Sequence, residues 1–324
     1  MVTSVVNLRN IQEARKAITP FIKRTPLVQS QFLSTSCGCG LFLKLENLQI
    51  TNSFKPRGVF NKLLHLSADE KSKGIITASA GNHGEAVAFV AQKLNFYARI
   101  VVPITTPKVK IDGIRKYGAD LVLFGENYDE AEHKAKELER KDGCAYISPY
   151  NDELIIAGHG TIGLEIIEAL PDVETVVVPL GGGGLISGIS IAVKSIKPET
   201  QVIGVQSKSS PIMYESLKAG KIVNVKKSKT KSIAEGLSGN VGPITFEIVQ
   251  KYVGRVVLAK EETLRHAVYL LRNYDKQVVE GSGAAAVAPV MDNNPLFKDK
   301  IVASVVTGGN IDRDLFQSIL KSEH

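Results

Sequence analysis

Short runs rich in β-branched residues alternate with longer amphipathic segments along almost the whole sequence. This alternation predicts a mostly parallel β-sheet flanked by helices, because parallel strands need long crossover connections. The expected strands lie at residues 41–45, 75–79, 98–102, 120–124, 145–148, 175–178, 201–205, 255–258 and 301–306. The fold class is therefore α/β, with twisted, mostly parallel sheets and helices on their faces.

Helices are expected between these strands, at residues 55–66, 83–94, 107–117, 128–141, 155–170, 185–197, 261–272 and 283–290. A chain of 324 residues is long enough for about two domains. No linker rich in Pro, Gly or Ser divides it. We therefore expect two lobes packed along a cleft rather than independent modules.

The composition excludes several classes of protein. Hydrophobic residues make up 44% and charged residues 23% of the chain, which is typical of globular proteins and rules out disorder, collagen and coiled coil. The net charge of +7 suits anionic ligands without selecting a partner. The Lys-rich run at 226–231 has no aromatic residue on which bases could stack, so we expect a solvated loop and no nucleic-acid partner.

The location of the protein follows from what the sequence lacks. The uncharged stretch 175–193 contains Pro179 and four consecutive glycines, so we interpret it as strand, loop and helix and expect no membrane partner. The first residues form no apolar signal segment, and three cysteines are too few for a disulfide framework. A cytoplasmic protein is expected.

The segment 53–58, Ser-Phe-Lys-Pro-Arg-Gly, places Lys55 directly before a proline that can start a helix. The positive end of the helix dipole and burial beside Phe54 both favour the neutral amine of a lysine. A neutral amine attacks carbonyl carbon, so Lys55 is a candidate for a Schiff base. Taken alone, Lys55 fits an ordinary surface lysine better.

Four glycines, Gly181, Gly182, Gly183 and Gly184, follow an expected strand and open an expected helix at Leu185. Consecutive backbone N–H groups at a helix N-terminus form a cup for a phosphate group. The run matches neither the Walker A pattern nor a dinucleotide fingerprint. The alternative is a tight structural turn.

The segment Ser79, Ala80, Gly81, Asn82, His83 also lies between an expected strand and an expected helix. Its backbone amides suit a carboxylate, and the Asn82 amide suits a ring hydroxyl. The alternative is a helix cap formed by Ser79 or Asn82.

Two further polar residues lie in apolar surroundings near the C-terminus. Thr307 follows the last expected strand, where its hydroxyl suits either a pyridine nitrogen or a helix cap. Glu280 lies in an apolar stretch, where an isolated carboxylate needs a partner.

An amine for a Schiff base, a phosphate cup, an amide for a phenolic oxygen and a hydroxyl for a pyridine nitrogen together describe a pyridoxal phosphate site. The sequence resembles the fold-type II pyridoxal phosphate enzymes, specifically the threonine dehydratase and serine racemase family. The resemblance covers nearly the whole chain through ordered motifs at 53–58, 79–84, 157–162, 181–184, 233–237, 280–284 and 307–310.

This resemblance implies a tryptophan synthase β-like architecture with the active site in the cleft between two domains. Residues 1–51 and 149–324 would form a large cofactor-binding domain, and residues 52–148 a small mobile domain. The expected cofactor is pyridoxal 5′-phosphate, the substrate is a small amino acid, and the protein is a homodimer or a higher homo-oligomer.

The resemblance also implies roles for individual residues. Lys55 would form the Schiff base and Phe54 would pack beside the cofactor ring, with Lys55 and Ser79 as the catalytic pair. The phosphate would lie on Gly181, Gly182, Gly183, Gly184 and Leu185. The rest of the cofactor would meet Asn82, Gly236, Glu280 and Thr307, and the substrate carboxylate would meet Ser79, Ala80, Gly81, Asn82 and His83.

The residue at position 80 bears on the reaction. A racemase needs a second acid on the opposite face of the α-carbon, and serine racemases resembling this chain have a serine where Ala80 stands. We therefore expect an L-threonine/L-serine dehydratase (ammonia-lyase) that forms a 2-oxo acid and ammonia by α,β-elimination. A serine racemase that uses Ser79, a 3-hydroxyaspartate dehydratase and a non-catalytic phosphate-binding protein stay open as alternatives.

Three departures from the family pattern qualify this expectation. Gln206 stands where a racemase-like metal site has a carboxylate, so no metal is expected there. His159 replaces the common glutamine and is interpreted as a packed imidazole, and Glu235 replaces an aspartate. The chain ends soon after Asn310, so we expect no regulatory domain and no feedback by isoleucine.

Overall fold

The computed structural model describes residues 6–225, 232–292 and 295–322. The Lys-rich run at 226–231, expected to form a solvated loop, lies outside these residues. No helix within the described ranges is both long and apolar enough to span a membrane.

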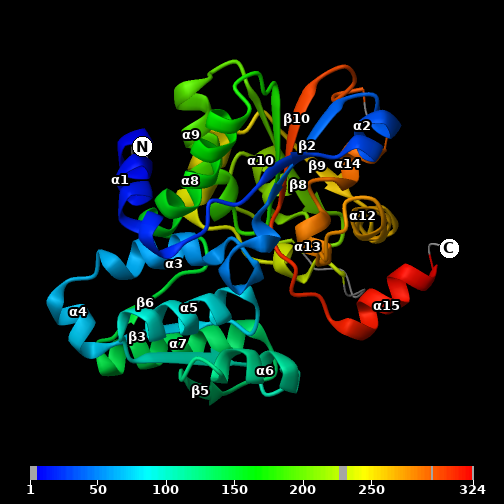
Figure 1. Ribbon diagram of the computed structural model, residues 1–324. Coiled ribbons are helices and arrows are strands. Elements are labelled where there is room, and N and C mark those ends of the chain that lie inside the picture. The colour runs from blue at the N-terminus through cyan, green and yellow to red at the C-terminus, as the bar shows by residue number, and fades with distance from the viewer. Residues whose placement is uncertain (1–5, 226–231, 293–294, 323–324) are drawn as a thin grey trace.

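Two separate sheets organise the chain (Figure 1). The larger has the strand order β1 (Leu27–Gln29), β2 (Gly40–Leu45), β10 (Ile301–Val306), β7 (Thr175–Pro179), β8 (Gln201–Ser207) and β9 (Arg255–Ala259). The smaller has the order β5 (Asp120–Leu123), β4 (Ala98–Val102), β3 (Ile75–Ala78) and β6 (Ala145–Tyr146). All neighbouring strands are parallel except β1 and β2, so the α/β prediction with mostly parallel sheets is confirmed.

The helices cover the faces of both sheets (Figure 1). Their bounds are α1 Leu8–Ile18, α2 Gln31–Cys37, α3 Lys55–Leu64, α4 Ala68–Lys73, α5 Asn82–Leu94, α6 Lys108–Arg115, α7 Tyr128–Asp142, α8 Glu153–Ala169, α9 Gly184–Ile196, α10 Ile212–Ala219, α11 Pro243–Tyr252, α12 Glu261–Asn273, α13 Gly281–Ala284, α14 Ala288–Met291 and α15 Arg313–Ser322. Short 3₁₀ turns occur at Thr19–Phe21, Glu46–Leu48, Ile50–Asn52 and Glu235–Leu237.

Each expected strand is present, but the helix expected at 283–290 is wrong as a single element. It is two short helices, α13 and α14, and Pro289 lies at the start of the second. A proline has no N–H for the helix and favours its first turn, so it begins a new helix here. The sequence interpretation also omitted β1 and helices α1, α2, α4, α10, α11 and α15.

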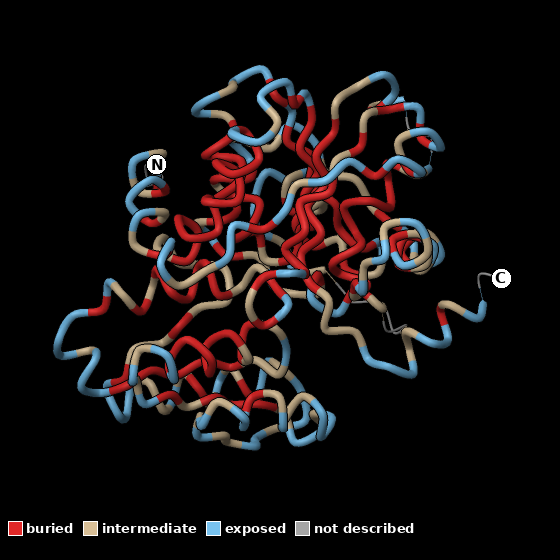
Figure 2. Tube along the Cα trace, in the orientation of Figure 1, coloured by how far each residue is buried: buried red, intermediate tan, exposed pale blue. Residues whose placement is uncertain are grey.

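Buried residues are concentrated in the strands of both sheets and in the helices packed against them (Figure 2). Every residue of β3 and of β7 is buried, as expected for parallel strands covered by helices on both faces. Strand β10 pairs with β2 from Ile301↔Gly40 to Val306↔Leu45, so the two ends of the chain share the larger sheet.

Helix α3 lies between the two sheet layers in Figure 1. It packs closely on α8, since a Cβ added to Gly158 would lie 2.7 Å from the Cα of Gly58. All strands of the smaller sheet fall within residues 52–148. The division of the chain into a large domain and a small mobile domain stays a prediction.

Candidate active site

The start of α3 lies directly beside the end of β10. Ser53 forms a bridge with Gly308, and the amide of Phe54 donates to the carbonyl of Thr307 over 3.1 Å. The amide of Gly309 donates to the carbonyl of Asn52 over 2.9 Å. These contacts place Lys55, the first residue of α3, next to the C-terminal motif.

The Lys55 amine is held among protein atoms rather than in bulk solvent. Its Nζ donates to the carbonyl of Pro149 over 2.8 Å and lies 5.0 Å from the centroid of the Phe54 ring. Desolvation lowers the pKa of Lys55 to about 8, although the charge of Glu280 acts in the opposite direction. A larger fraction of this amine is therefore neutral near pH 7 than for an ordinary lysine.

The four-glycine segment leaves β7 and enters α9 with no room for side chains. A Cβ added to Gly182 would lie 2.5 Å from the Tyr150 ring, and one added to Gly184 would lie 2.7 Å from the Tyr150 carbonyl oxygen. Gly183 has a φ of +96°, which L side chains rarely adopt. The hydroxyl of Thr245 donates to the carbonyl of Gly182 over 2.7 Å and holds the turn. The first N–H groups of α9, at Gly184 and Leu185, have no acceptor within the helix and suit an anion.

Asn82 begins α5 and reaches across to the C-terminal half of the chain. Its Nδ2 donates to Glu280 Oε1 over 2.7 Å, and its Oδ1 accepts from Asn310 Nδ2 over 2.8 Å. Burial raises the pKa of Glu280 to about 7, although the hydrogen bond from Asn82 acts in the opposite direction. These contacts join the two halves of the site and fix the orientation of the Asn82 amide.

The turn before α5 presents mostly backbone. The hydroxyl of Ser79 accepts from the amide of Gly81 over 3.3 Å. Ala80 contributes only a methyl group at this turn. His83 is buried, its Nε2 lies 3.0 Å from the carbonyl of Ile147, and burial followed by the charge of Lys55 lowers its pKa to about 3. Its imidazole is therefore neutral.

Gly236 and Thr307 meet at one further residue, Ser282. The Ser282 hydroxyl accepts from the amide of Gly236 over 2.9 Å, and its carbonyl accepts from the Thr307 hydroxyl over 3.3 Å. A Cβ added to Gly181 would lie 2.8 Å from the carbonyl oxygen of Gly236. The glycine segment, the 236 turn and Thr307 are therefore neighbours.

Two of the three residues that depart from the family pattern, His159 and Gln206, lie in different surroundings. His159 packs edge-on against Phe54 with ring centroids 4.8 Å apart, and burial lowers its pKa well below the ordinary value. Gln206 is buried, and its side-chain oxygen accepts from the amide of Tyr214 over 3.0 Å.

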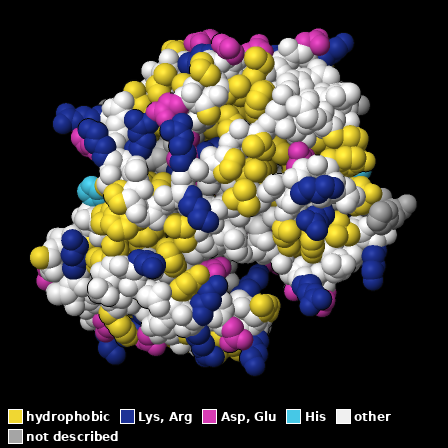
Figure 3. Space-filling view, viewed as in Figure 1, with side chains coloured by type: hydrophobic (Ala, Val, Ile, Leu, Met, Phe, Trp, Pro, Cys, Tyr) yellow, Lys and Arg dark blue, Asp and Glu magenta, His cyan; other side chains and the backbone are white. Residues whose placement is uncertain are grey.

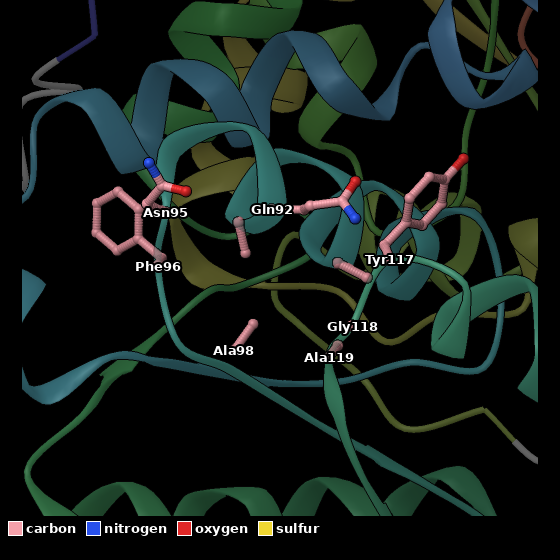
Figure 4. Close-up of a pocket in the computed structure, with 9 residues that line it drawn as sticks. Gln92, Asn95, Phe96, Ala98, Tyr117, Gly118 and Ala119 are labelled. Atoms are coloured by element: carbon pink, nitrogen blue, oxygen red, sulfur yellow. The ribbon is translucent and has the colours of Figure 1, made fainter.

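The structure thus brings the sequence-predicted residues together, and it adds Tyr150, Ser282, Asn310 and Thr245, to which the sequence interpretation gave no role. Ser282 and Asn310 lie inside quoted motifs, so their motifs could have drawn attention to them. Tyr150 and Thr245 lie in no such motif. A cavity of about 290 Å³ elsewhere, lined by Gln92, Asn95 and Tyr117 among others, contains none of the predicted site residues (Figure 4).

A comparison with known families shows which class of protein has this arrangement of residues. Residues 18–308 match the family described as pyridoxal-phosphate dependent enzyme, and the chain belongs to this family. It is 45% identical to the L-threonine ammonia-lyase of Thermotoga maritima over 317 residues, which cover 98% of this chain and 78% of the relative.

Two solved structures have nearly the same fold. Maize serine racemase superposes with a TM-score of 0.92 at 31% identity, covering 98% of each chain. The processed form of threonine deaminase isoform 2 from Solanum lycopersicum superposes with a TM-score of 0.91 at 35% identity, covering 98% of this chain and 91% of that one. The fold alone therefore does not separate the two activities.

The residues present fit pyridoxal 5′-phosphate, the cofactor of this family. A partly desolvated amine with a lowered pKa suits an aldehyde, and a side-chain-free turn at a helix N-terminus suits a phosphate. The assignment of individual residues to parts of the cofactor stays a prediction.

Proposed function

We propose that the protein is an L-threonine/L-serine ammonia-lyase, which converts a β-hydroxy amino acid to a 2-oxo acid and ammonia. The observation that carries this proposal is Ala80, whose methyl group stands where resembling serine racemases have a hydroxyl. The similarity to the L-threonine ammonia-lyase of Thermotoga maritima supports the same reaction.

When bound, pyridoxal 5′-phosphate supplies an electron-withdrawing ring that acidifies the α-hydrogen of the amino acid joined to it. Lys55 would hold its aldehyde end and Phe54 would pack beside its ring, and the phosphate would lie on Gly181–Gly184 and Leu185. Asn82, Gly236, Glu280 and Thr307 complete the proposed set.

Lys55 is the proposed base that takes the α-proton at Nζ. With a pKa of about 8 instead of 10.5, the neutral fraction of this amine at pH 7 rises by about 300-fold. Its hydrogen bond to the Pro149 carbonyl limits the positions that the amine can take. The lowered pKa therefore supplies a base close to the operating pH.

The substrate carboxylate is proposed to bind the turn of residues 79–83 at the start of α5. The N–H groups of a first helical turn lack acceptors within the helix and favour an anion. His83 is neutral and buried below this turn, so it adds no charge that would change the affinity for the carboxylate.

A second candidate function, serine racemase with side dehydratase activity, is favoured by the close superposition on maize serine racemase. In that case Ser79 would be the second acid. Its hydroxyl already accepts from the Gly81 amide, which leaves its O–H free to donate.

One incubation separates these reactions. L-threonine and L-serine are supplied separately, and 2-oxo acid, ammonia and D-serine are quantified. We expect 2-oxo acid and ammonia in equal amounts with little D-serine, and we expect Ala80→Ser to raise the share of D-serine. Predominant D-serine from the unmodified protein would overturn the proposal.

A non-catalytic phosphate-binding protein would behave differently. Borohydride reduction of the protein with its cofactor should attach the cofactor to the peptide that contains Lys55, as mass spectrometry can detect. An unmodified Lys55 after reduction would favour the binding protein.

We also propose a cytoplasmic homodimer or higher homo-oligomer. Figure 3 shows groups of hydrophobic side chains on the surface. Among the exposed hydrophobic residues, Phe32 stacks on Tyr274 with ring centroids 3.4 Å apart, and Val28, Leu48 and Val278 lie on neighbouring segments. Light scattering after size-exclusion chromatography tests the assembly, and a monomeric mass would refute it.

A further inference from the structure

Four charged side chains form a buried cluster next to the start of α3. Arg57 and Glu46 are 0% exposed, Lys44 is 1% exposed and Glu165 is 7% exposed. We call these four residues the Arg57 cluster. It has two cations and two carboxylates, and so it is balanced in charge.

Arg57 lies at the centre of the cluster and uses its whole guanidinium group. Its Nε and Nη2 donate to the two oxygens of Glu46, both over 2.8 Å. Its Nη1 and Nη2 donate to the two oxygens of Glu165, over 2.7 and 2.9 Å. Nη1 also donates to the hydroxyl of Thr161 over 3.2 Å. Two bidentate pairs fix both the position and the plane of this side chain.

The partners of Arg57 come from two directions. Glu46 follows β2 of the larger sheet, whereas Glu165 lies on α8. Lys44, on β2, closes the cluster by donating to Glu165 over 2.5 Å and to the carbonyl of Thr25 over 2.7 Å. The first turn of α3 is therefore tied both to the sheet and to α8.

Burying four charges is costly, and well-packed apolar residues often stabilise a fold equally well. A contribution to stability alone is therefore a weak explanation for the cluster. The position of the cluster suggests a better explanation, since Arg57 is two residues from Lys55 in the same first turn of α3. The lysine side chain is long and flexible, so the location of its amine depends on a fixed backbone at its base.

We propose that Arg57 is a positioning residue for Lys55, holding the first turn of α3 so that the Lys55 amine stays against Pro149 beside the glycine segment. The proposal rests on the proposed role of Lys55 in the reaction. Arg57 is not among the residues proposed to hold the cofactor, and it would act on Lys55 only through the backbone of α3.

Arg57→Lys tests the proposal, because it keeps the charge and loses the planar fork. The matched control is Lys62→Met, which removes a lysine of the same helix whose partner is Asp152 at 2.8 Å, away from the cluster. The readout is the pKa of Lys55 in the full chain freed of cofactor, measured from the pH dependence of its acetylation by mass spectrometry.

We expect Arg57→Lys to raise the pKa of Lys55 by about one unit, because a displaced amine regains water. We also expect dissociation of pyridoxal phosphate from the holoenzyme to become about tenfold faster, while Lys62→Met changes neither quantity. If Arg57→Lys does not fold, the charge-balanced double variant Lys44→Met/Glu165→Gln, which keeps the Arg57–Glu46 pair, should change both in the same direction.

The proposal would be overturned if folded Arg57→Lys lowers thermal stability but leaves the pKa of Lys55 and the cofactor dissociation rate unchanged. The same holds for the double variant if Arg57→Lys does not fold. Such a result would assign the cluster a structural role only. Neither readout uses turnover, so failure of the proposed lyase reaction would be recognised separately.

Discussion

Replacing Lys55 by methionine should stabilise the cofactor-free protein at pH 7. Burial lowers the pKa of this amine from 10.5 to about 8, and each unit corresponds to about 1.4 kcal/mol, so the charged amine costs the fold about 3 kcal/mol. Methionine has a similar length and no charge to desolvate. The variant also leaves the carbonyl of Pro149 without the Lys55 donor, so we expect a net gain of about 1–2 kcal/mol.

The sign of the pH dependence follows from proton binding. Between pH 8 and 10.5 the unfolded chain holds the Lys55 proton and the folded chain has released it, so stability of the unmodified protein rises with pH. The penalty is fully present below pH 8 and is lost as the pH approaches 10.5. About two fifths of the penalty is lost by pH 9, whereas the cost of the missing hydrogen bond to Pro149 stays constant, so most of the net advantage of Lys55→Met should be gone near pH 9.

Urea unfolding of the cofactor-free proteins at pH 7.0, 8.0, 9.0 and 9.5 measures this difference, with Lys62→Met as the control for loss of a lysine from α3. An advantage of Lys55→Met that stays constant across this range, or a loss of stability at pH 7, would refute the account of a desolvated amine. The holoenzyme is not informative here, because the bound cofactor removes the free amine.

Three further predictions concern the rest of the site. Gly183→Ala should weaken cofactor binding at least tenfold in an absorbance titration, because residue 183 has a φ of +96° and the added methyl group would lie 2.8 Å from Thr245 Cβ. The control is Gly220→Ala, since Gly220 also has a positive φ of +68° but has open space for a methyl group. Thr245→Val removes the hydrogen bond to the Gly182 carbonyl, worth about 1 kcal/mol, so cofactor affinity should fall about fivefold. The contribution of Glu280 to stability should fall as the pH rises from 4.5 to about 7, because burial keeps this carboxyl protonated in the fold. Thermal unfolding of Glu280→Gln should therefore lose less stability over this range than the unmodified protein, and equal slopes for the two proteins would contradict the prediction.

The sequence predicted the strands well because β-branched runs are a local signal. Strand β1, with only three residues at the antiparallel edge, is too short for that signal. Helix α1 was detectable, since Asn7 and Asn10 form a capping box and Ile11, Ala14 and Ile18 share a buried face. Its omission was an error of interpretation rather than a lack of information.

The site was predictable wherever a motif combines a special backbone with a reactive group. The glycine segment and the residue before Pro56 are examples. Contacts between distant segments were not predictable in the same way. The Tyr150 ring leaves room only for a glycine at position 182, and Arg57 pairs with Glu165, which is 108 residues away in the sequence. Neither contact leaves a local pattern in the sequence.

Two groups of buried charges in this protein, the Arg57 cluster and the pair Lys55 and Glu280, differ in how burial changes their pKa values. In the Arg57 cluster, desolvation would raise the pKa of Glu165, but the charge of Arg57 and its hydrogen bonds prevail and the pKa is lowered. At the site, desolvation prevails instead, so the pKa of Lys55 falls to about 8 and that of Glu280 rises to about 7. The ordinary values of these two groups, 10.5 and 4.5, differ by about six units, or about 8 kcal/mol for moving a proton from the amine to the carboxylate.

Burial reduces that gap to about one unit, even though the mutual attraction of the two charges acts to widen it. A proton can therefore be held on either side of the site at nearly equal free energy near neutral pH, which is the condition that general acid–base catalysis requires. In the Arg57 cluster, the charge of Arg57 and its hydrogen bonds keep the pKa of Glu165 below its ordinary value, so this carboxylate stays charged over the same pH range. The incomplete pairing of Lys55 and Glu280 thus makes these two groups, rather than Glu165, suited to moving protons.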